Sequence, residues 1–296
     1  MKKMNFMSFS VLMVSAIMVL NSCDASKKVV NEPIAEVVVV EEVVNETETD
    51  SVSAIKIITE TEVVIQNDTI SETEVITETT QTEIFDHTIW NDLLNKHVSE
   101  KGNVNYKGFK SDYSILKNYL ISLSEKTPDD TWSKEDKLAY WINAYNAYTV
   151  QLIVDRYPLK SIKDIESPWD FRFIKLGEKW FTLNDIEHKI LRKMDDPRIH
   201  FGIVCASFSC PKLQNEAFVA ATVNAQLDAA TKEFLSDSTR NNLSENSIQL
   251  SKIFKWFSKD FKKEGSLIDF LNKYSEITIS QNAKKSFKEY IWDLNE

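Results

Sequence analysis

Residue types that often carry chemistry are scarce in this chain: its 296 residues include only three cysteines and four histidines. The chain lacks a closely spaced ligand pair such as CxxC or HExxH, which counts against a metal site. It also lacks a basic patch with interleaved aromatic residues, so we expect no nucleic-acid partner. No motif indicates a bound cofactor, and we expect none.

The first residues have the pattern of an export signal. Lys2 and Lys3 precede an apolar run over residues 6–20, which is too short for a transmembrane span, and Ser22 stands directly before Cys23. This pattern resembles a bacterial lipoprotein signal, in which residues 1–22 are removed and Cys23 is diacylated; the alternative is a plain secretory signal. We therefore expect a lipid anchor on Cys23 that holds the protein to a membrane of the bacterial cell envelope, at the outer membrane and facing the periplasm or the surface.

Residues 23–84 lack both aromatic residues and glycine and are rich in Val, Thr and Glu. They contain 15 acidic residues against 3 Lys, whereas residues 85–296 balance at 30 acidic and 30 basic residues. A charged stretch without aromatic residues cannot bury enough apolar surface to fold, and its self-repulsion extends it. We predict a disordered stalk that lifts the following domain off the membrane.

Residues 85–296 are long enough for one domain with its own core, and they contain all seven tryptophans. Residues 133–158 are apolar nearly all round, with Ser133 as N-cap and Pro158 at the end, which predicts a central buried helix. Further helices are predicted over residues 85–98, 109–124, 184–194, 222–235, 252–261 and 266–274. Strands are predicted in a hairpin over 170–183 and at 198–205, 247–251, 276–280 and 288–294. The class is α+β, a helix-rich single domain with a small, mainly antiparallel sheet.

Two predicted helices carry polar residues that need an explanation. Asn143 and Asn146 lie on one face of the central helix, where they either tie neighbouring segments in place or line a pocket. The helix over residues 184–194 has Asn184 as N-cap and Glu187 at N3. His188 lies one turn from that N-terminus and is expected to be neutral, so it is either a base or ligand, or a group bonded to a loop carbonyl.

The segment "RIHFGIVCASFSCPK", residues 198–212, contains one histidine and two cysteines. In a regular strand side chains alternate, which places Arg198 and His200 on one face and Cys205 on the other, toward the core. Cys210 follows in a loop with Ser207 and Ser209, where His200 or His188 can reach it. This favours Cys210 as the nucleophile.

Four alternatives for the two cysteines remain open. The compartment permits a disulfide between Cys205 and Cys210, although a core-facing Cys205 has to turn to meet its partner. A catalytic thiol and inert packing are the second and third alternatives. A metal site with His188 and His200 is the fourth, and it has the right atoms without a close ligand pair.

Four blocks of the sequence together resemble the family catalogued as domain of unknown function 547. They are "YWINAYNAYTVQLIVDRYPLKSIKDI", "TLNDIEHKILR", "DPRIHFGIVCASFSCPKLQNEAF" and "LSKIFKWFSKDF". The resemblance covers residues 130–262 and implies a secreted or lipid-anchored bacterial protein, without implying one biochemical activity. The family pattern includes Asn143, Asn146, Asp185, Glu187, His188, Asp196, Pro197, Arg198, His200, Cys205, Ser207, Cys210 and Pro211, all of which are present.

The predicted order of a central helix and then a strand bearing a histidine is also similar to papain-like and transglutaminase-like cysteine enzymes. In those enzymes a cysteine opens the central helix, whereas residues 133–158 contain none. A thiol enzyme of this kind needs Cys210 to reach the site from its loop, so the likeness is one of fold analogy.

Three functions follow from these patterns. The first is a cysteine-dependent hydrolase or acyl transferase acting on peptide or cell-wall material, with Cys210 as nucleophile, His200 or His188 as base, and Asn143 or Asn146 as orienting groups. The second is a non-catalytic module of the envelope that binds a peptide or glycan. Its candidate contacts are Trp141, Asn146, Glu187, Arg198, His200, Ser207 and Ser209. The third is a thiol–disulfide protein that uses Cys205 and Cys210.

Overall fold

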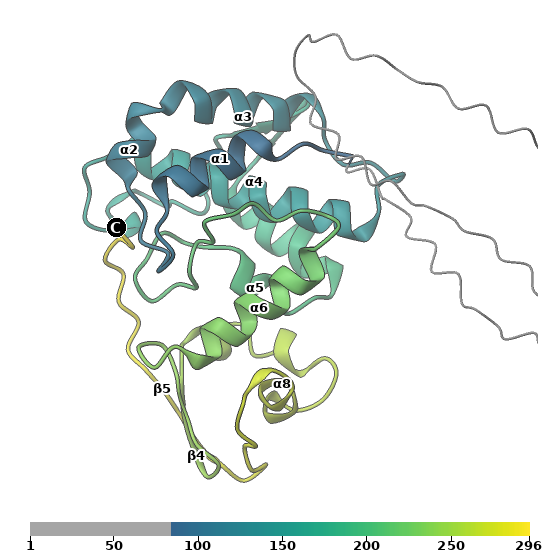
Figure 1. Cartoon of the computed structure of the whole chain (residues 1–296), viewed down its shortest axis with the longest axis vertical. Coiled ribbons are helices and arrows are strands. Elements are labelled where there is room, and N and C mark those ends of the chain that lie inside the picture. Colours follow the sequence, from purple (N-terminus) through teal and green to yellow (C-terminus); the bar gives the residue numbers. More distant parts are fainter. Residues whose placement is uncertain (1–83) are drawn as a thin grey trace, which may run out of the picture. The chain divides into compact units, whose positions relative to one another are not determined.

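The computed structural model describes residues 84–296 (Figure 1). The predicted lipoprotein signal, the lipid anchor on Cys23 and the stalk up to residue 83 lie outside the described residues. Within residues 84–296, no helix is both long and apolar enough to cross a membrane.

The N-terminal half of the domain is built around one buried helix, as predicted. Ser133 caps this helix by accepting a hydrogen bond from the Asp136 backbone N–H at 3.0 Å, and sixteen of its 21 residues are buried. The helix is surrounded by shorter ones because its apolar surface runs nearly all the way round. In chain order the helices are α1 (Thr88–His97), α2 (Tyr106–Ser111), α3 (Tyr113–Glu125) and the central α4 (Lys134–Val154).

The strands are few and short. The predicted hairpin is present as β1 (Ile174–Leu176) and β2 (Lys179–Phe181), an antiparallel pair that turns at Gly177 with φ +55°. A second sheet has the order β3-β4-β5, in which β3 (Asn242–Leu243) runs antiparallel and β5 (Lys284–Phe287) parallel to β4 (Ser247–Leu250). The helix-rich α+β class is therefore confirmed.

The C-terminal half contains two regular helices, α6 (Val223–Ser236) and α8 (Leu267–Tyr274), and several short turns of helix. Figure 1 shows α1–α4 on one side of α5 and α6, and β4, β5 and α8 on the other. The buried side chains form two hydrophobic clusters accordingly, one around α4 and one around α8 and β4. Cys205 and Trp292 pack against both clusters, so they lie where the two meet. Short helical turns occur in both halves of the domain: η1 (Ile162–Asp164), η2 (Asp185–Ile190), η3 (Leu191–Met194), α5 (Ile199–Gly202), α7 (Ile253–Trp256) and η4 (Asp260–Lys262).

The strand predicted over residues 198–205 is wrong. These residues form the four-residue helix α5 and then leave it in extended conformation at Ile203. The helical turn starts because Asp196 accepts a hydrogen bond from the Arg198 backbone N–H at 3.0 Å, and Pro197 suits the first turn of a helix. The alternation of side chains that the strand implied therefore does not apply.

Other boundaries also differ from the prediction. Residues 184–194 are helical, but as the wide turn η2 followed by the tight turn η3, and the predicted cap Asn184 donates to Asp170 instead. Thr182 caps the turn, because its hydroxyl accepts from the Asp185 backbone N–H at 3.0 Å. The helix predicted over 252–261 breaks into α7 and η4. The strands predicted at 276–280 and 288–294 are absent, and the strand that forms is β5, between them.

Candidate functional site

A tight turn brings the two cysteines of the domain together. Ala206 has φ +56°, a left-handed conformation that costs a residue with a Cβ about 1 kcal/mol or more. The turn folds Cys210 back against Cys205, so that the two Sγ atoms lie 2.8 Å apart and the Cys205 backbone N–H donates to Cys210 Sγ at 2.8 Å. The chain's last residues hold the turn in place, since Ser207 pairs with Leu294 and the Phe208 N–H donates to Asp293 O at 2.7 Å.

The exposure of the two thiols is the reverse of the prediction. Both cysteines line one pocket, but Cys205 is half-buried, whereas Cys210 is only 4 % exposed and belongs to the core. The prediction assumed strand alternation, which a helical turn followed by a left-handed residue does not obey. His200 and Cys205 therefore line the same pocket instead of facing opposite sides.

The pocket that Cys205 faces is a cavity of about 290 Å³ at the junction of the two hydrophobic clusters. Its polar groups include the Cys205 thiol, the Glu187 carboxyl and the imidazoles of His188 and His200. Much of the remaining wall is aromatic. The aromatic residues that line it are Tyr145, Trp169, Trp256, Phe257, Tyr290 and Trp292.

Hydrogen bonds single out Cys205 as the more acidic thiol. Ser207 Oγ lies 3.1 Å and Tyr290 Oη 3.2 Å from Cys205 Sγ. Burial raises the pKa of Cys205, but the hydrogen bonds from Cys210, Ser207 and Tyr290 outweigh burial and lower the pKa to about 7. Burial and the neighbouring Cys205 raise the pKa of Cys210, so the negative charge of the pair resides on Cys205.

Glu187 adds a second group that titrates near neutral pH. Its side chain is buried, and its Oε2 lies 3.3 Å from Tyr145 Oη, a phenol whose own pKa burial raises, so the phenol is the donor. Burial first, and the charge of Cys205 second, raise the pKa of the Glu187 carboxyl to about 7. A carboxyl that is half protonated at pH 7 can both give and take a proton.

The two histidines are held by a partly buried ion pair. Asp260 accepts from Arg192 at 2.6 Å and 3.1 Å, and its Oδ2 lies 2.9 Å from His200 Nε2. Arg192 Nη1 also lies 3.3 Å from His188 Nδ1. Burial lowers the pKa of both His200 and His188, so both rings are neutral at pH 7. In residues 84–296 no hydrogen bond joins either ring to a cysteine sulfur.

The two asparagines of α4 tie neighbouring segments in place and do not line the pocket, which decides between the two alternatives that the sequence left open. The Asn146 side chain donates to the Gly202 carbonyl oxygen at 2.8 Å and accepts from the Val204 N–H at 2.9 Å. Both backbone groups belong to the segment that leads directly into Cys205. Asn143 makes the same pair of bonds with Phe218, at 2.7 Å and 3.0 Å. Neither side chain is among the residues that line the pocket. The prediction that one of them orients groups of a catalytic site by contacting them there is therefore wrong.

Of the remaining residues that were predicted to contact a ligand, some lie at the pocket and others only stabilise the fold. Ser207 belongs to the site through its contact with Cys205. Ser209 accepts from the Ile291 N–H at 2.9 Å and so fixes the C-terminal segment. Trp141 packs on Tyr140 and Phe181 and lines no part of this pocket, so the cleft predicted from Trp141, Asn146, Arg198 and His200 does not form.

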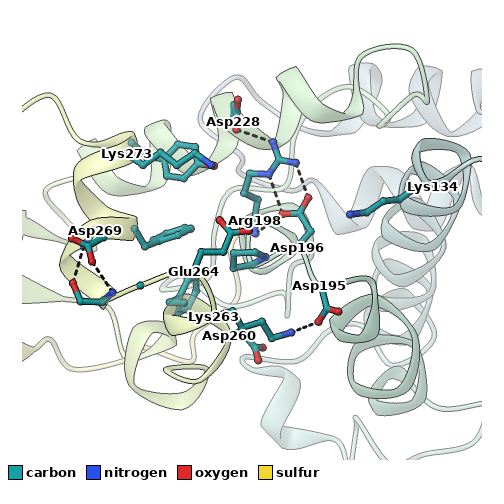
Figure 2. Close-up of a pocket in the computed structure, with 16 residues that line it drawn as sticks. Lys134, Asp195, Asp196, Arg198, Asp228, Asp260, Lys263, Glu264, Asp269 and Lys273 are labelled. Atoms are coloured by element: carbon teal, nitrogen blue, oxygen red, sulfur yellow. Dashed lines mark hydrogen bonds and ion pairs between the residues drawn. The ribbon is translucent and has the colours of Figure 1, made fainter.

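Arg198 lines a different cavity, of about 360 Å³ (Figure 2). Its guanidinium donates to Asp196 at 2.6 Å and to Asp228 at 2.8 Å, and Lys263 pairs with Asp195 across the same cavity. The prediction that Arg198 shares a cleft with His200 is therefore wrong. Asp260 connects the two regions, because it lines this cavity and also binds His200.

Several residues of the pocket were not predicted. Tyr290 and Trp292 lie more than eighty positions from Cys205 in the sequence, and no local pattern relates the two segments. Asp260, which binds His200 without lining this pocket, lacks a local signal as well, whereas Arg192 stands four residues after His188, a helical spacing that indicates their contact. The one available signal for the aromatic residues was the aromatic content of "KWF" at 255–257 and "YIW" at 290–292, which indicates packing as readily as a pocket.

No metal centre accompanies these groups: within residues 84–296, no set of three or more His, Cys, Asp or Glu side chains is placed to hold a metal ion. The fold and the pocket thus define an α+β domain with a pair of thiols at an aromatic-walled cavity. Residues 130–235 match the family model described as "Protein of unknown function, DUF547". The predicted resemblance is therefore confirmed over that segment, which includes Glu187, His200 and both cysteines.

No curated protein and no solved structure matches the chain. The analogy with papain-like and transglutaminase-like enzymes consequently has no structural support. Asp260 and Tyr290 lie beyond the segment that the family model matches.

Proposed function

We propose that this chain is a lipid-anchored protein of the bacterial cell envelope with a cysteine-dependent hydrolase or acyl transferase activity, in which Cys205 is the nucleophile. The observation that carries the proposal is the environment of Cys205 Sγ. This sulfur faces a cavity and is hydrogen-bonded to Cys210, Ser207 and Tyr290, which favours the reactive thiolate near pH 7. Cys210, the nucleophile predicted from the sequence, is buried beneath it.

The acid–base roles follow from the protonation states. In acyl transfer, Cys205 Sγ forms a bond to the carbonyl carbon, and the leaving group departs with a proton. Arginine can only donate, so the lone pair of neutral His188 at Nδ1 is taken by Arg192, whereas neutral His200 donates Nε2–H to Asp260 and keeps a lone pair on Nδ1. Glu187 is a carboxyl with a pKa of about 7 and can donate. Glu187 is therefore proposed as the proton donor to the leaving group, and His200 as the base that activates the water or amine that resolves the thioester.

The walls of the cavity favour a neutral, apolar or aromatic group as substrate. No Lys or Arg belongs to its lining, so no cation is placed there to bind a phosphate or a carboxylate. A volume of about 290 Å³ at an aromatic wall suits a short acyl chain or one side chain of a peptide. An apolar residue within a cell-envelope peptide fits this description.

A second candidate function is non-catalytic binding of a peptide or glycan. Trp256 is 47 % exposed and lies nearly parallel to Trp292, with ring centroids 6.0 Å apart. An exposed, rigid aromatic surface of this kind can stack on a sugar ring or an apolar side chain. The two candidates differ in whether Cys205 forms a bond to the ligand.

An acylation experiment tests the catalytic proposal. The full chain in detergent is incubated with nitrophenyl esters of straight-chain acids of increasing length, and the adduct is located by peptide mass mapping. We expect a thioester on Cys205 that hydroxylamine removes, and none in Cys205→Ser. The matched control Cys210→Ser is expected to keep the adduct. Acylation that persists unchanged in Cys205→Ser, or an absence of any adduct together with binding of the acyl group, contradicts the catalytic proposal and favours the binding module.

A further inference from the structure

We infer that Cys205 and Cys210 form an oxidation site that exchanges electrons with external disulfides, Cys205 as the attacking thiol and Cys210 as the resolving one. This activity shares with the proposed function the assignment of Cys205 as the nucleophile, and it does not depend on acyl transfer.

The two thiols are close enough to form a disulfide with little movement. The two Sγ atoms lie 2.8 Å apart, and a disulfide bond is about 2.05 Å long, so closing it requires a movement of less than about 1 Å. The left-handed turn at Ala206 has already brought the two side chains face to face. Backbone contacts with residues 293–295 hold this turn, so its geometry does not depend on the cysteines alone.

The two thiols differ in access. Both cysteines line the cavity, but Cys205 is half-buried, whereas Cys210 is 4 % exposed and has the sulfur of Cys205 as its neighbour. An external disulfide can therefore meet Cys205 first, and Cys210 can attack only what has formed on Cys205. An acidic, accessible thiol beside a second cysteine is the arrangement found in redox-sensitive thiol sites.

The reaction has two steps, and its electrons balance. The Cys205 thiolate attacks one sulfur of the external disulfide, forming a mixed disulfide while the other half leaves as a thiolate. Cys210 then attacks Cys205 Sγ, the bond between the two protein sulfurs forms, and the second half leaves with the proton that Cys210 gives up. The external disulfide is reduced by two electrons to two thiols, and the protein dithiol is oxidised to a disulfide.

Closure of this bond has a consequence for the pocket. A disulfide between Cys205 and Cys210 removes the thiolate, so acyl transfer stops until a reductant restores both thiols. Outside the cytosol, where the lipoprotein signal directs the chain, disulfides persist and this exchange is chemically accessible.

The test uses oxidised glutathione as the probe and the full chain in detergent. Wild-type protein is oxidised, remaining thiols are blocked with a maleimide, and peptides are mapped by mass. We expect a Cys205–Cys210 disulfide without bound glutathione, reversed by dithiothreitol. Cys210→Ser is expected to accumulate a stable glutathione adduct on Cys205, and Cys205→Ser to gain no adduct on Cys210 while folded.

Stable glutathione on Cys205 in the wild type, or prior modification of Cys210, overturns the inference. The wild-type measurement needs no variant, so it decides the matter even if a substituted chain fails to fold. Acylation of Cys205 without a Cys205–Cys210 disulfide contradicts this inference alone. A disulfide that closes as described in a protein that no ester acylates contradicts the proposed acyl transfer alone.

Discussion

At the scale of single residues, Glu187 shows how burial sets the chemistry of this pocket. An ordinary carboxyl is fully ionised at pH 7, but Glu187 is enclosed by apolar walls and lies near the Cys205 thiolate, so it keeps its proton to about pH 7. In the folded chain its pKa is raised above its unfolded value. The stability gained from binding this proton is therefore fully present below pH 4.5 and is lost as the pH rises through 7.

Replacing Glu187 with Gln should remove this pH dependence. Between pH 4.5 and about 7, we expect the free energy of unfolding of the wild type to fall by roughly 3 kcal/mol relative to Glu187→Gln. Urea unfolding of both proteins at several pH values measures the difference. The control Glu178→Gln changes an exposed glutamate and should follow the wild type. Parallel curves for the wild type and Glu187→Gln contradict the raised pKa.

The sequence could predict the residues of this site better than their roles. It drew attention to both cysteines, to Glu187 and to two histidines, because polar residues within apolar segments need partners. It could not assign the nucleophile, because that depended on the conformation of one residue, Ala206. A left-handed alanine leaves no mark in the sequence, unlike a glycine at the same position.

At the scale of elements, α4 positions the Cys205 turn through Asn146. Asn143 and Asn146 both bind a carbonyl and an N–H of a neighbouring segment, so they form a natural comparison. Only the segment held by Asn146 leads directly into Cys205. The hydrogen bonds of Asn143 therefore stabilise the fold only, whereas those of Asn146 also position the Cys205 thiol.

Alanine substitutions at these two positions should separate the effects. We expect both Asn143→Ala and Asn146→Ala to lower the free energy of unfolding by about 2–4 kcal/mol, because each leaves two buried backbone groups without partners. Only Asn146→Ala should also slow the alkylation of Cys205 at pH 7, which iodoacetamide kinetics measure. Equal slowing in Asn143→Ala would show that general loosening, and not the placement of the turn, controls the thiol.

The sequence predicts best the elements whose apolar pattern continues over many residues. The helix α4 has an uninterrupted apolar pattern, an N-cap and a terminating proline, and all three survive in the structure. The α5 segment is only four residues long, and its isoleucine and phenylalanine suit a strand as well as a helix. The Asp196–Pro197 pair was the better guide there, since it favours the start of a helical turn.

At the scale of the whole molecule, Asp260 links the two halves of the domain. Asp260 begins η4, in the part of the chain whose apolar residues form the cluster around α8 and β4. It binds Arg192 and His200, which come from the segments that precede Cys205. Burial raises the pKa of Asp260, but the hydrogen bonds from His200 and Arg192 outweigh burial and hold the pKa below its usual range. Its stabilising effect is thus present above the unfolded value of 3.8 and is lost as the pH falls further.

Asp260→Asn should therefore weaken the contact between the halves. We expect a loss of about 2 kcal/mol in the free energy of unfolding at pH 7, typical of hydrogen bonds to a charged group, and a smaller loss below pH 3.8. A double-mutant cycle with Arg192→Gln should show strong non-additivity, because the two side chains contact each other. Additive effects would mean that the ion pair contributes nothing to joining the halves.

This long-range arrangement could not be predicted from the sequence. The pocket combines residues from 145, 169, 184–188, 200–211, 253–257 and 290–292, and these segments meet because of how the two hydrophobic clusters pack.

The function proposed for this pocket requires Cys205 to be an accessible, acidic thiol and Cys210 a buried one. The most direct test alkylates the folded full chain with iodoacetamide between pH 5 and 10 and locates the label by peptide mass mapping. We expect Cys205 to be labelled and Cys210 to stay unlabelled, with a rate at Cys205 that rises through a midpoint near pH 7. First labelling at Cys210, or a midpoint near the free-thiol pKa of about 8.5, would contradict it.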